Sequence, residues 1–240
     1  MSIESKQSLI VSASQTDVNA CLGVIQALTY AQDNMCKLFY DLGCDGIRLT
    51  KSHHAFWAVT KTKVDLSGEI KWLDNVEITT KITCIKPIRL NLETIIFNDF
   101  GQVKITQEIV AMDSENRKVR MINSIPNFPS ADSIENDNIY KFDSLKLDDV
   151  DYRFVGEIKV DSNMIDYFEH TNNIAYARII LGTMDAEFLK DSKPKNFEIH
   201  YLKETRYLDV LKVYKNDSDG NILFKICKDD EIVCLAKLNY

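Results

Sequence analysis

Residues 69–74, Glu-Ile-Lys-Trp-Leu-Asp, are echoed by residues 204–209, Glu-Thr-Arg-Tyr-Leu-Asp. Each segment has Glu, any residue, a basic residue, an aromatic residue, Leu and Asp, and each leads into a run of alternating polar and apolar residues. A six-residue match alone is weak support for a repeat. Because a helical pattern precedes the segment and a sheet pattern follows it in both halves, we predict that the chain is a duplication of one unit.

The first half predicts one long helix followed by antiparallel strands. Apolar residues recur at spacings of three and four from Val24 to Leu42, which is the pattern of one helix face, and Gly43 is a suitable stop. Later runs that begin near residues 76, 88, 103 and 119 alternate between apolar and polar residues. A period of two over several runs indicates an antiparallel sheet with one buried face, so we predict an α+β fold.

A change of composition separates the two halves. Residues 126–151 contain Pro126, Pro129 and many Asp, Asn and Ser residues with weak periodicity, and we interpret them as a linker. The predicted N-terminal unit is then 1–125, and the predicted C-terminal unit is 152–240.

The second half repeats the order of elements in a shorter form. A strand is expected over residues 154–160 and a helix from about Asn172 to Leu189. Asp219-Gly220 predicts a tight hairpin between two later strands. The remaining strand-like runs lie near 196–203, 208–215, 221–228 and 231–239.

Composition and charge exclude several classes of protein. Hydrophobic residues make up 45% of the chain and charged residues 27%, which is ordinary for a globular protein. The net charge of −7 argues against a general nucleic-acid-binding protein. No apolar run approaches the roughly 18 residues of a membrane helix, and the N-terminus lacks the apolar core of a signal peptide. We therefore expect a cytoplasmic protein that binds neither nucleic acid nor membrane.

The six cysteines predict neither a metal site nor a nucleophile. They show no Cys-x-x-Cys spacing, which makes a zinc site improbable, and buried reduced thiols fit best. None stands in a nucleophile setting with a nearby His. No metal and no organic cofactor is expected.

The candidate chemistry lies in Asp166-Tyr-Phe-Glu-His170-Thr-Asn-Asn-Ile-Ala-Tyr176 and in Glu204. Two carboxylates and an imidazole would surround the start of the second helix, where they can activate water near a thioester or ester carbonyl. Thr171 or Asn172 is a suitable N-cap. The backbone amides near Asn172 and Asn173 would then face the carbonyl oxygen.

The motif resembles that of the acyl-ACP thioesterases of the double hot-dog type. In that family the second half carries Asp-x-Asn-x-His-Val-Asn-Asn-x-x-Tyr and a later Tyr-x-x-Glu, often followed by Cys in plant members. The first half resembles the family in its long helix, in Trp57 and in the segment that begins Trp72-Leu-Asp-Asn-Val. The matching residues of the second half are Asp166, His170, Asn172, Asn173, Tyr176, Tyr201 and Glu204.

The resemblance implies a tandem (double) hot-dog fold, in which two antiparallel sheets are each wrapped around a long helix. It also implies hydrolysis of a fatty acyl thioester, with an acyl carrier protein that bears the acyl chain as the partner. Under this reading the catalytic candidates are Asp166, His170 and Glu204.

Two positions depart from the family pattern. Phe168 stands where the family has Asn, and Thr205 stands where plant members often have Cys. A carboxamide can orient a carboxylate or donate to a carbonyl, whereas a phenyl ring does neither. Phe168 and Thr205 join Asn172 and Asn173 as candidate substrate-binding residues.

Several alternatives stay open at this point. Taken singly, Asp166 and Glu204 fit surface ion pairs and His170 fits a capping residue. Glu69 is interpreted as structural, because its half lacks an Asp and His constellation before the helix. An acyl-CoA thioesterase on the same fold and, because of Phe168, a catalytically weak acyl-binding protein are the rival functions. Acyl chain length and the existence of a homodimer are left open.

Overall fold

The computed structural model describes residues 3–135, 139–145, 150–218 and 220–240. Asp219 of the predicted hairpin lies outside these residues. The chain divides into two compact units, Met1–Phe142 and Asp143–Tyr240, called here the first and second unit. Their boundary falls inside the segment predicted as a linker.

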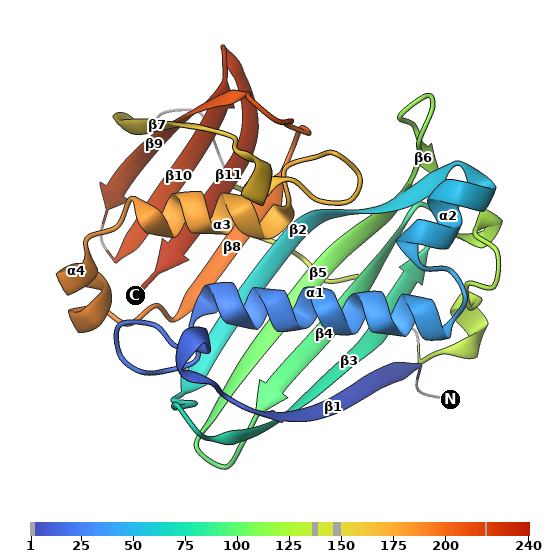
Figure 1. Ribbon diagram of the computed structural model, residues 1–240, viewed down its shortest axis with the longest axis horizontal. Coiled ribbons are helices and arrows are strands. Elements are labelled where there is room, and N and C mark those ends of the chain that lie inside the picture. Colours follow the sequence, from blue (N-terminus) through green and yellow to red (C-terminus); the bar gives the residue numbers. More distant parts are fainter. Residues whose placement is uncertain (1–2, 136–138, 146–149, 219) are drawn as a thin grey trace. The chain divides into compact units, whose positions relative to one another are not determined.

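The first unit is an antiparallel sheet with one long helix lying across a face of the sheet (Figure 1). Its strands run in the order β1-β3-β4-β5-β2, and the short β6 pairs with β5. The strands are β1 (Glu4–Ile10), β2 (Ala55–Gly68), β3 (Asn75–Lys86), β4 (Arg89–Phe97), β5 (Gly101–Asp113) and β6 (Val119–Arg120). The helices are α1 (Val24–Asp41) and α2 (Gly46–His53), with 3₁₀ turns at Ala13–Gln15, Ile122–Ser124 and Ala131–Ser133.

Helix α1 agrees with its sequence prediction to within one residue. Its apolar face, which includes Leu28, Leu38 and Phe39, is buried against the sheet. Burying a side chain of this size contributes about 1.5–3 kcal/mol. The helix ends where Gly43 takes a φ of 75° and the Cys44 amide donates to the Phe39 carbonyl at 2.9 Å, which satisfies a carbonyl of the last turn.

The second unit repeats this topology. Its strand order is β7-β9-β10-β11-β8, so each strand has the neighbours that its counterpart has in the first unit. The α+β prediction and the predicted repeat are therefore confirmed. The elements are β7 (Arg153–Lys159), α3 (Asn173–Gly182), α4 (Ala186–Asp191), β8 (Asn196–Tyr201), β9 (Val210–Ser218), β10 (Asn221–Lys228) and β11 (Glu231–Asn239), with a 3₁₀ turn at Ser162–Met164.

The prediction of a single helix that reaches Leu189 is wrong, because two short helices occupy this stretch. Helix α3 ends at Gly182, and α4 begins after Asp185. The Asp185 carboxylate accepts the amides of Glu187 and Phe188 at 2.8 and 3.1 Å, which is the arrangement of a helix N-cap. This cap starts a new helix although the apolar residues continue.

The repeated six-residue segment forms the same turn in both units. The carboxylate of Asp74 accepts the amide of Lys71 at 2.8 Å, and that of Asp209 accepts the amide of Arg206 at 2.8 Å. Each turn places its Leu in the left-handed region, with φ of 68° at position 73 and 70° at position 208. A side chain that accepts an amide three residues earlier stabilises such a turn, which explains the shared final Asp.

Candidate functional site

Asp166 organises the loop that precedes α3. Its Oδ1 accepts the amides of Phe168 at 2.9 Å and His170 at 3.2 Å, and its own amide donates to the His170 carbonyl at 2.8 Å. Glu169 takes a φ of 64°, which turns the chain back sharply. These bonds hold His170 at the end of a tight loop next to the helix start.

His170 and Glu204 lie side by side. His170 Nε2 is 3.3 Å from Glu204 Oε2, and the two side chains are 12% and 40% exposed. The segments that carry them are joined one residue later, where the Thr171 amide donates to the Thr205 carbonyl at 2.8 Å. A partly screened imidazole next to a more exposed carboxylate is an arrangement that can take a proton from water.

The charge of Asp166 is coupled to both neighbours. Burial raises the pKa of this carboxyl above its ordinary value, and the charge of Glu204 adds to the rise. The amides of His170 and Phe168 and the charge of His170 oppose it. The structure therefore brings Asp166, His170 and Glu204 within electrostatic reach of one another; their roles stay a prediction.

The first turn of α3 has one backbone amide without a partner in the part of the chain that the structure describes. Asn172 is the N-cap, since its Oδ1 accepts the Ile174 amide at 2.8 Å. The Asn172 amide donates to Met164 O at 2.8 Å, and the Ala175 amide donates to Asn172 O at 2.9 Å. Among the residues that the structure describes, the Asn173 amide has no acceptor and stays open to a ligand.

Phe168 contributes its backbone amide to the hydrogen bonds of the loop. Its ring is half-buried and packs edge-on against Tyr167, with ring centroids 5.4 Å apart. The hydrogen bond to Asp166 uses only the amide of Phe168. A Phe at this position is therefore compatible with the hydrogen bond that shapes the loop. The departure from the family pattern changes the side chain that the loop presents.

Thr205 lies behind the pair rather than on the surface. It is 1% exposed, and its Oγ1 lies 2.7 Å from Thr171 Oγ1 and 2.7 Å from the Tyr176 hydroxyl. The sequence pattern does not predict these contacts, and it makes Thr205 a candidate substrate-binding residue. That role stays a prediction, but the hydroxyl is occupied by two side chains.

The first unit contains a counterpart of the loop. Asp17 Oδ1 accepts the amides of Asn19 at 2.8 Å and Cys21 at 3.2 Å, and Ala20 takes a φ of 55°. The Asp17 amide donates to the Cys21 carbonyl at 2.8 Å. Cys21 thus stands where the second unit has His170.

The first half was predicted to lack an Asp and His constellation, and the structure shows that its loop contains only the Asp. The signal available was the spacing of four between Asp17 and Cys21, which equals that between Asp166 and His170. Glu69 takes the position of Glu204 in the repeated segment.

Burial makes several of the thiols poor nucleophiles. All six cysteines are free. Burial raises the pKa of Cys44 to about 12 and also raises the pKa of Cys227 and Cys234. These thiols keep their protons near neutral pH. Because only the thiolate form is nucleophilic, they are poor nucleophiles.

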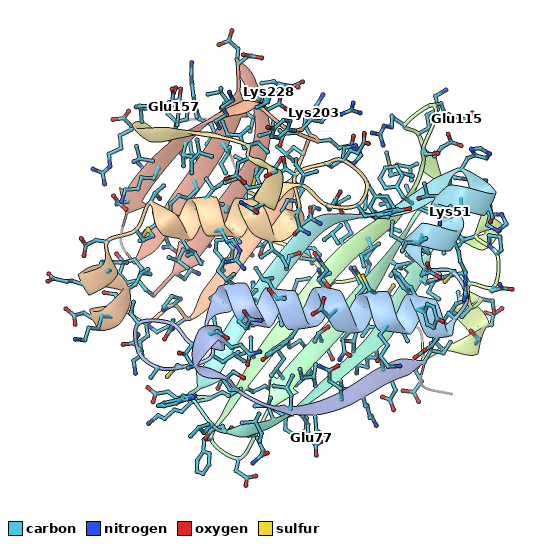
Figure 2. The ribbon with its side chains drawn as sticks, in the orientation of Figure 1. Lys51, Glu77, Glu115, Glu157, Lys203 and Lys228 are labelled. Carbon is cyan, nitrogen blue, oxygen red and sulfur yellow. The ribbon has the colours of Figure 1, made fainter. Side chains whose placement is uncertain are left out.

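The lysines beside the site are paired with acids. Lys203 Nζ lies 2.9 Å from Glu231, and Lys228 Nζ lies 2.9 Å from Asp209; both lysines are labelled in Figure 2.

Within the described ranges, no group of three or more His, Cys, Asp or Glu residues could hold a metal ion. In the same part of the chain, no helix is long and apolar enough to cross a membrane.

Family models match both halves of the chain. The family model of the acyl-ACP thioesterase N-terminal domain matches residues 4–125, and that of the acyl-ACP thioesterase C-terminal domain matches residues 147–240. No curated protein matches the chain by sequence.

Two solved structures share the fold over nearly the whole chain. An acyl-ACP thioesterase from Bacteroides thetaiotaomicron VPI-5482 has a TM-score of 0.85 and 16% identity, covering 98% of this chain and 97% of that one. A 12:0-ACP thioesterase from Umbellularia californica has a TM-score of 0.82 and 16% identity, covering 99% and 96%. At such low identity the likeness shows the fold alone, and the predicted tandem hot-dog fold is confirmed.

Proposed function

The chain belongs to the acyl-ACP thioesterase family, and on this premise we propose that it releases free fatty acid from acyl-ACP by activating water in its second unit. The observation that carries the proposal is the 3.3 Å contact between His170 Nε2 and Glu204 Oε2 at the start of α3. The proposed partner is an acyl carrier protein with an acyl chain on its thiol, and the proposed location is the cytoplasm.

In the proposed reaction, Glu204 is the base. It takes a proton from water as the water oxygen bonds to the thioester carbonyl carbon. The carbon–sulfur bond then breaks, and the proton held by the Glu204–His170 pair passes to the sulfur, which leaves as the carrier thiol. Asp166 holds the loop in place through the amides of Phe168 and His170.

The start of α3 supplies the donor for the oxyanion. The Asn173 amide is the open N–H of the first turn, and the helix dipole places partial positive charge there. A preorganised donor of this kind stabilises the charge that develops on the carbonyl oxygen. Asn172 caps the helix and so fixes the direction of that amide. Phe168 offers apolar area beside the carbonyl.

The second candidate function is a catalytically weak acyl-binding protein. It is favoured by Phe168, which removes the carboxamide that the family pattern places in the loop. The remaining groups, Glu204, His170 and the Asn173 amide, support a slower enzyme rather than an inert one. Losing one oxyanion-type donor costs about 2.7–4 kcal/mol, which slows the chemical step without abolishing it.

Single-turnover assays of Glu204→Gln against Glu69→Gln test the proposal. Glu69 has the same place in the repeated segment but has no His before its helix. We expect the first variant to lose about 10²–10⁴-fold in rate and the second to keep the wild-type rate.

The substrates in this assay are panels of acyl-ACP and acyl-CoA, with the product acids identified by mass. Faster hydrolysis of acyl-CoA would move the substrate assignment to coenzyme A thioesters. Equal turnover by Glu204→Gln and the wild type would overturn the proposed base. A wild type that binds acyl ligands but does not hydrolyse them would favour the acyl-binding protein.

A further inference from the structure

We infer that Thr205 is a positioning residue for the His170–Glu204 pair, acting through a buried chain of three hydroxyl groups. This inference rests on the proposed function of the pair. The chain runs from Tyr176 through Thr205 to Thr171, with an oxygen–oxygen distance of 2.7 Å in each step.

The three hydroxyls are nearly inaccessible to water. Tyr176 is 2% exposed, Thr205 is 1% exposed and Thr171 is 5% exposed. Burial raises the pKa of Tyr176, so its phenol keeps its proton and can donate. A hydroxyl has one hydrogen and two lone pairs, so Thr205 can accept from one neighbour and donate to the other. Buried hydroxyls that satisfy one another in this way form a rigid unit.

The chain of hydroxyls joins the two segments that carry the site. Thr171 directly follows His170, and Thr205 directly follows Glu204. The side-chain link between the two threonines and the 3.3 Å contact between the imidazole and the carboxylate therefore span the same pair of segments. A shift of one segment against the other would change both distances.

The first unit serves as an internal comparison. Its counterparts of Thr171, Thr205 and Tyr176 are Leu22, Ile70 and Ala27, and none of these has a hydroxyl. The backbone link is nevertheless kept, since the Leu22 amide donates to the Ile70 carbonyl at 2.7 Å.

The fold therefore forms this junction with apolar side chains alone. The hydroxyl chain occurs in the unit whose loop presents a His beside the Glu, and it is replaced by apolar residues in the unit whose loop presents Cys21. We attribute this difference to positioning of the pair, because the first unit keeps the backbone link of the junction without any of the hydroxyls.

The test compares three variants. Thr205→Val removes the hydroxyl and keeps the side-chain shape, whereas Thr205→Ser keeps the hydroxyl. Thr80→Val is the matched control, because Thr80 and Thr94 form another buried pair of threonine hydroxyls at 2.7 Å in the first unit. It removes a bond of the same kind from the unit that does not carry the candidate site.

We expect Thr205→Val to lower kcat about 10- to 100-fold with little change in KM, since a misplaced catalytic group costs rate more than binding. Thr205→Ser should recover most of the loss, and Thr80→Val should keep the wild-type kcat. Thermal unfolding of all three variants verifies that each is folded. Equal effects of Thr205→Val and Thr80→Val on kcat, or no effect of either, would overturn the inference.

A second readout does not depend on turnover. The ring signals of His170 in spectra of ¹³C-labelled histidine are assigned with His170→Gln. They should move in Thr205→Val, return in Thr205→Ser and stay in place in Thr80→Val. If the wild type has no thioesterase activity, the proposed function fails, while these signals still test positioning. If the His170 signals do not move in Thr205→Val, the inference that Thr205 positions the pair is overturned.

Discussion

Asp17 and Asp166 occupy equivalent positions in the two units, and each accepts the backbone amide of the fourth residue after it at 3.2 Å. That fourth residue is Cys21 in the first unit and His170 in the second. The same backbone loop therefore presents a thiol in one copy and an imidazole in the other. Under the proposed function, the presented side chain and not the loop decides which copy carries the chemistry.

His170→Gln and Cys21→Ser test this division. Removing the imidazole should lower turnover of acyl-ACP about 10²–10⁴-fold, because a positioned acid–base group contributes that much. Changing Cys21 should leave turnover within about twofold, since the substitution removes no member of the His170–Glu204 pair and keeps the loop's backbone bonds. The measurement is the initial rate with saturating acyl-ACP. A large loss in Cys21→Ser would place chemistry in the first unit.

Phe168→Asn tests the departure from the family pattern. The loop should accept Asn, because Asn19 stands at the equivalent position of the first unit and donates the same amide bond to its Asp at 2.8 Å. We expect kcat to rise by up to about 10²–10³-fold, the gain from one restored donor.

Asn19→Phe is the control for this change, and it should leave kcat unaltered. Unchanged kcat in Phe168→Asn, in an active wild type, would mean that another group already supplies the missing donor.

Asp166→Asn should change how stability depends on pH. Burial raises the pKa of Asp166 above its ordinary 3.8, so the folded chain holds this proton more tightly than the unfolded chain. Asp166 therefore favours folding fully below that value, and its contribution is lost as the pH rises through the folded pKa. Asn does not ionise, so the variant loses no such contribution. Its free energy of unfolding should therefore increase relative to that of the wild type as the pH rises through the folded pKa of Asp166.

Urea unfolding at a series of pH values measures the effect. A difference between variant and wild type that is constant across acid and neutral pH would contradict the shift assigned to Asp166.

Glu93→Gln should show the opposite dependence. Burial alone would raise the pKa of this carboxyl, but hydrogen bonds and charges from Lys104 and Lys81 outweigh it and lower the pKa below 4.5. Lys81 Nζ lies 3.3 Å from the carboxylate across neighbouring strands. The stabilisation is present above the unfolded pKa and is lost as the pH falls through the folded one.

The measurement is again urea unfolding, of wild type and Glu93→Gln. The two should differ at neutral pH and converge in acid, and added salt should narrow the neutral difference only in part, since the pair is half-buried. Convergence at neutral pH would show that the two lysines contribute nothing.

Residues with a strong local pattern were predictable from the sequence. The apolar spacing from Val24 onward predicted α1 to within one residue. The break before α4 was not predicted, because it depends on the Asp185 side chain accepting two amides while apolar residues continue on both sides. Capping competes with periodicity here, and periodicity alone does not reveal the result.

The same distinction applies to the candidate site. Spacing and resemblance pointed to His170 and Glu204, which the structure places 3.3 Å apart. The contact of Thr205 with Thr171, 34 residues away in sequence, has no local signal. Such contacts follow from strand and loop placement, and a single sequence carries no record of them.

Among the described residues, the hydrogen bonds that the carboxylate accepts in each loop come from backbone amides, so these bonds can form whichever side chains the loop displays. In a duplicated chain with this property, one copy can gain, lose or exchange its reactive side chain while both copies still fold. For protein engineering, the first unit is accordingly an acceptor site, in which Cys21→His together with hydroxyls at positions 22, 27 and 70 would reproduce the side chains of the second unit on a loop with the same backbone hydrogen bonds.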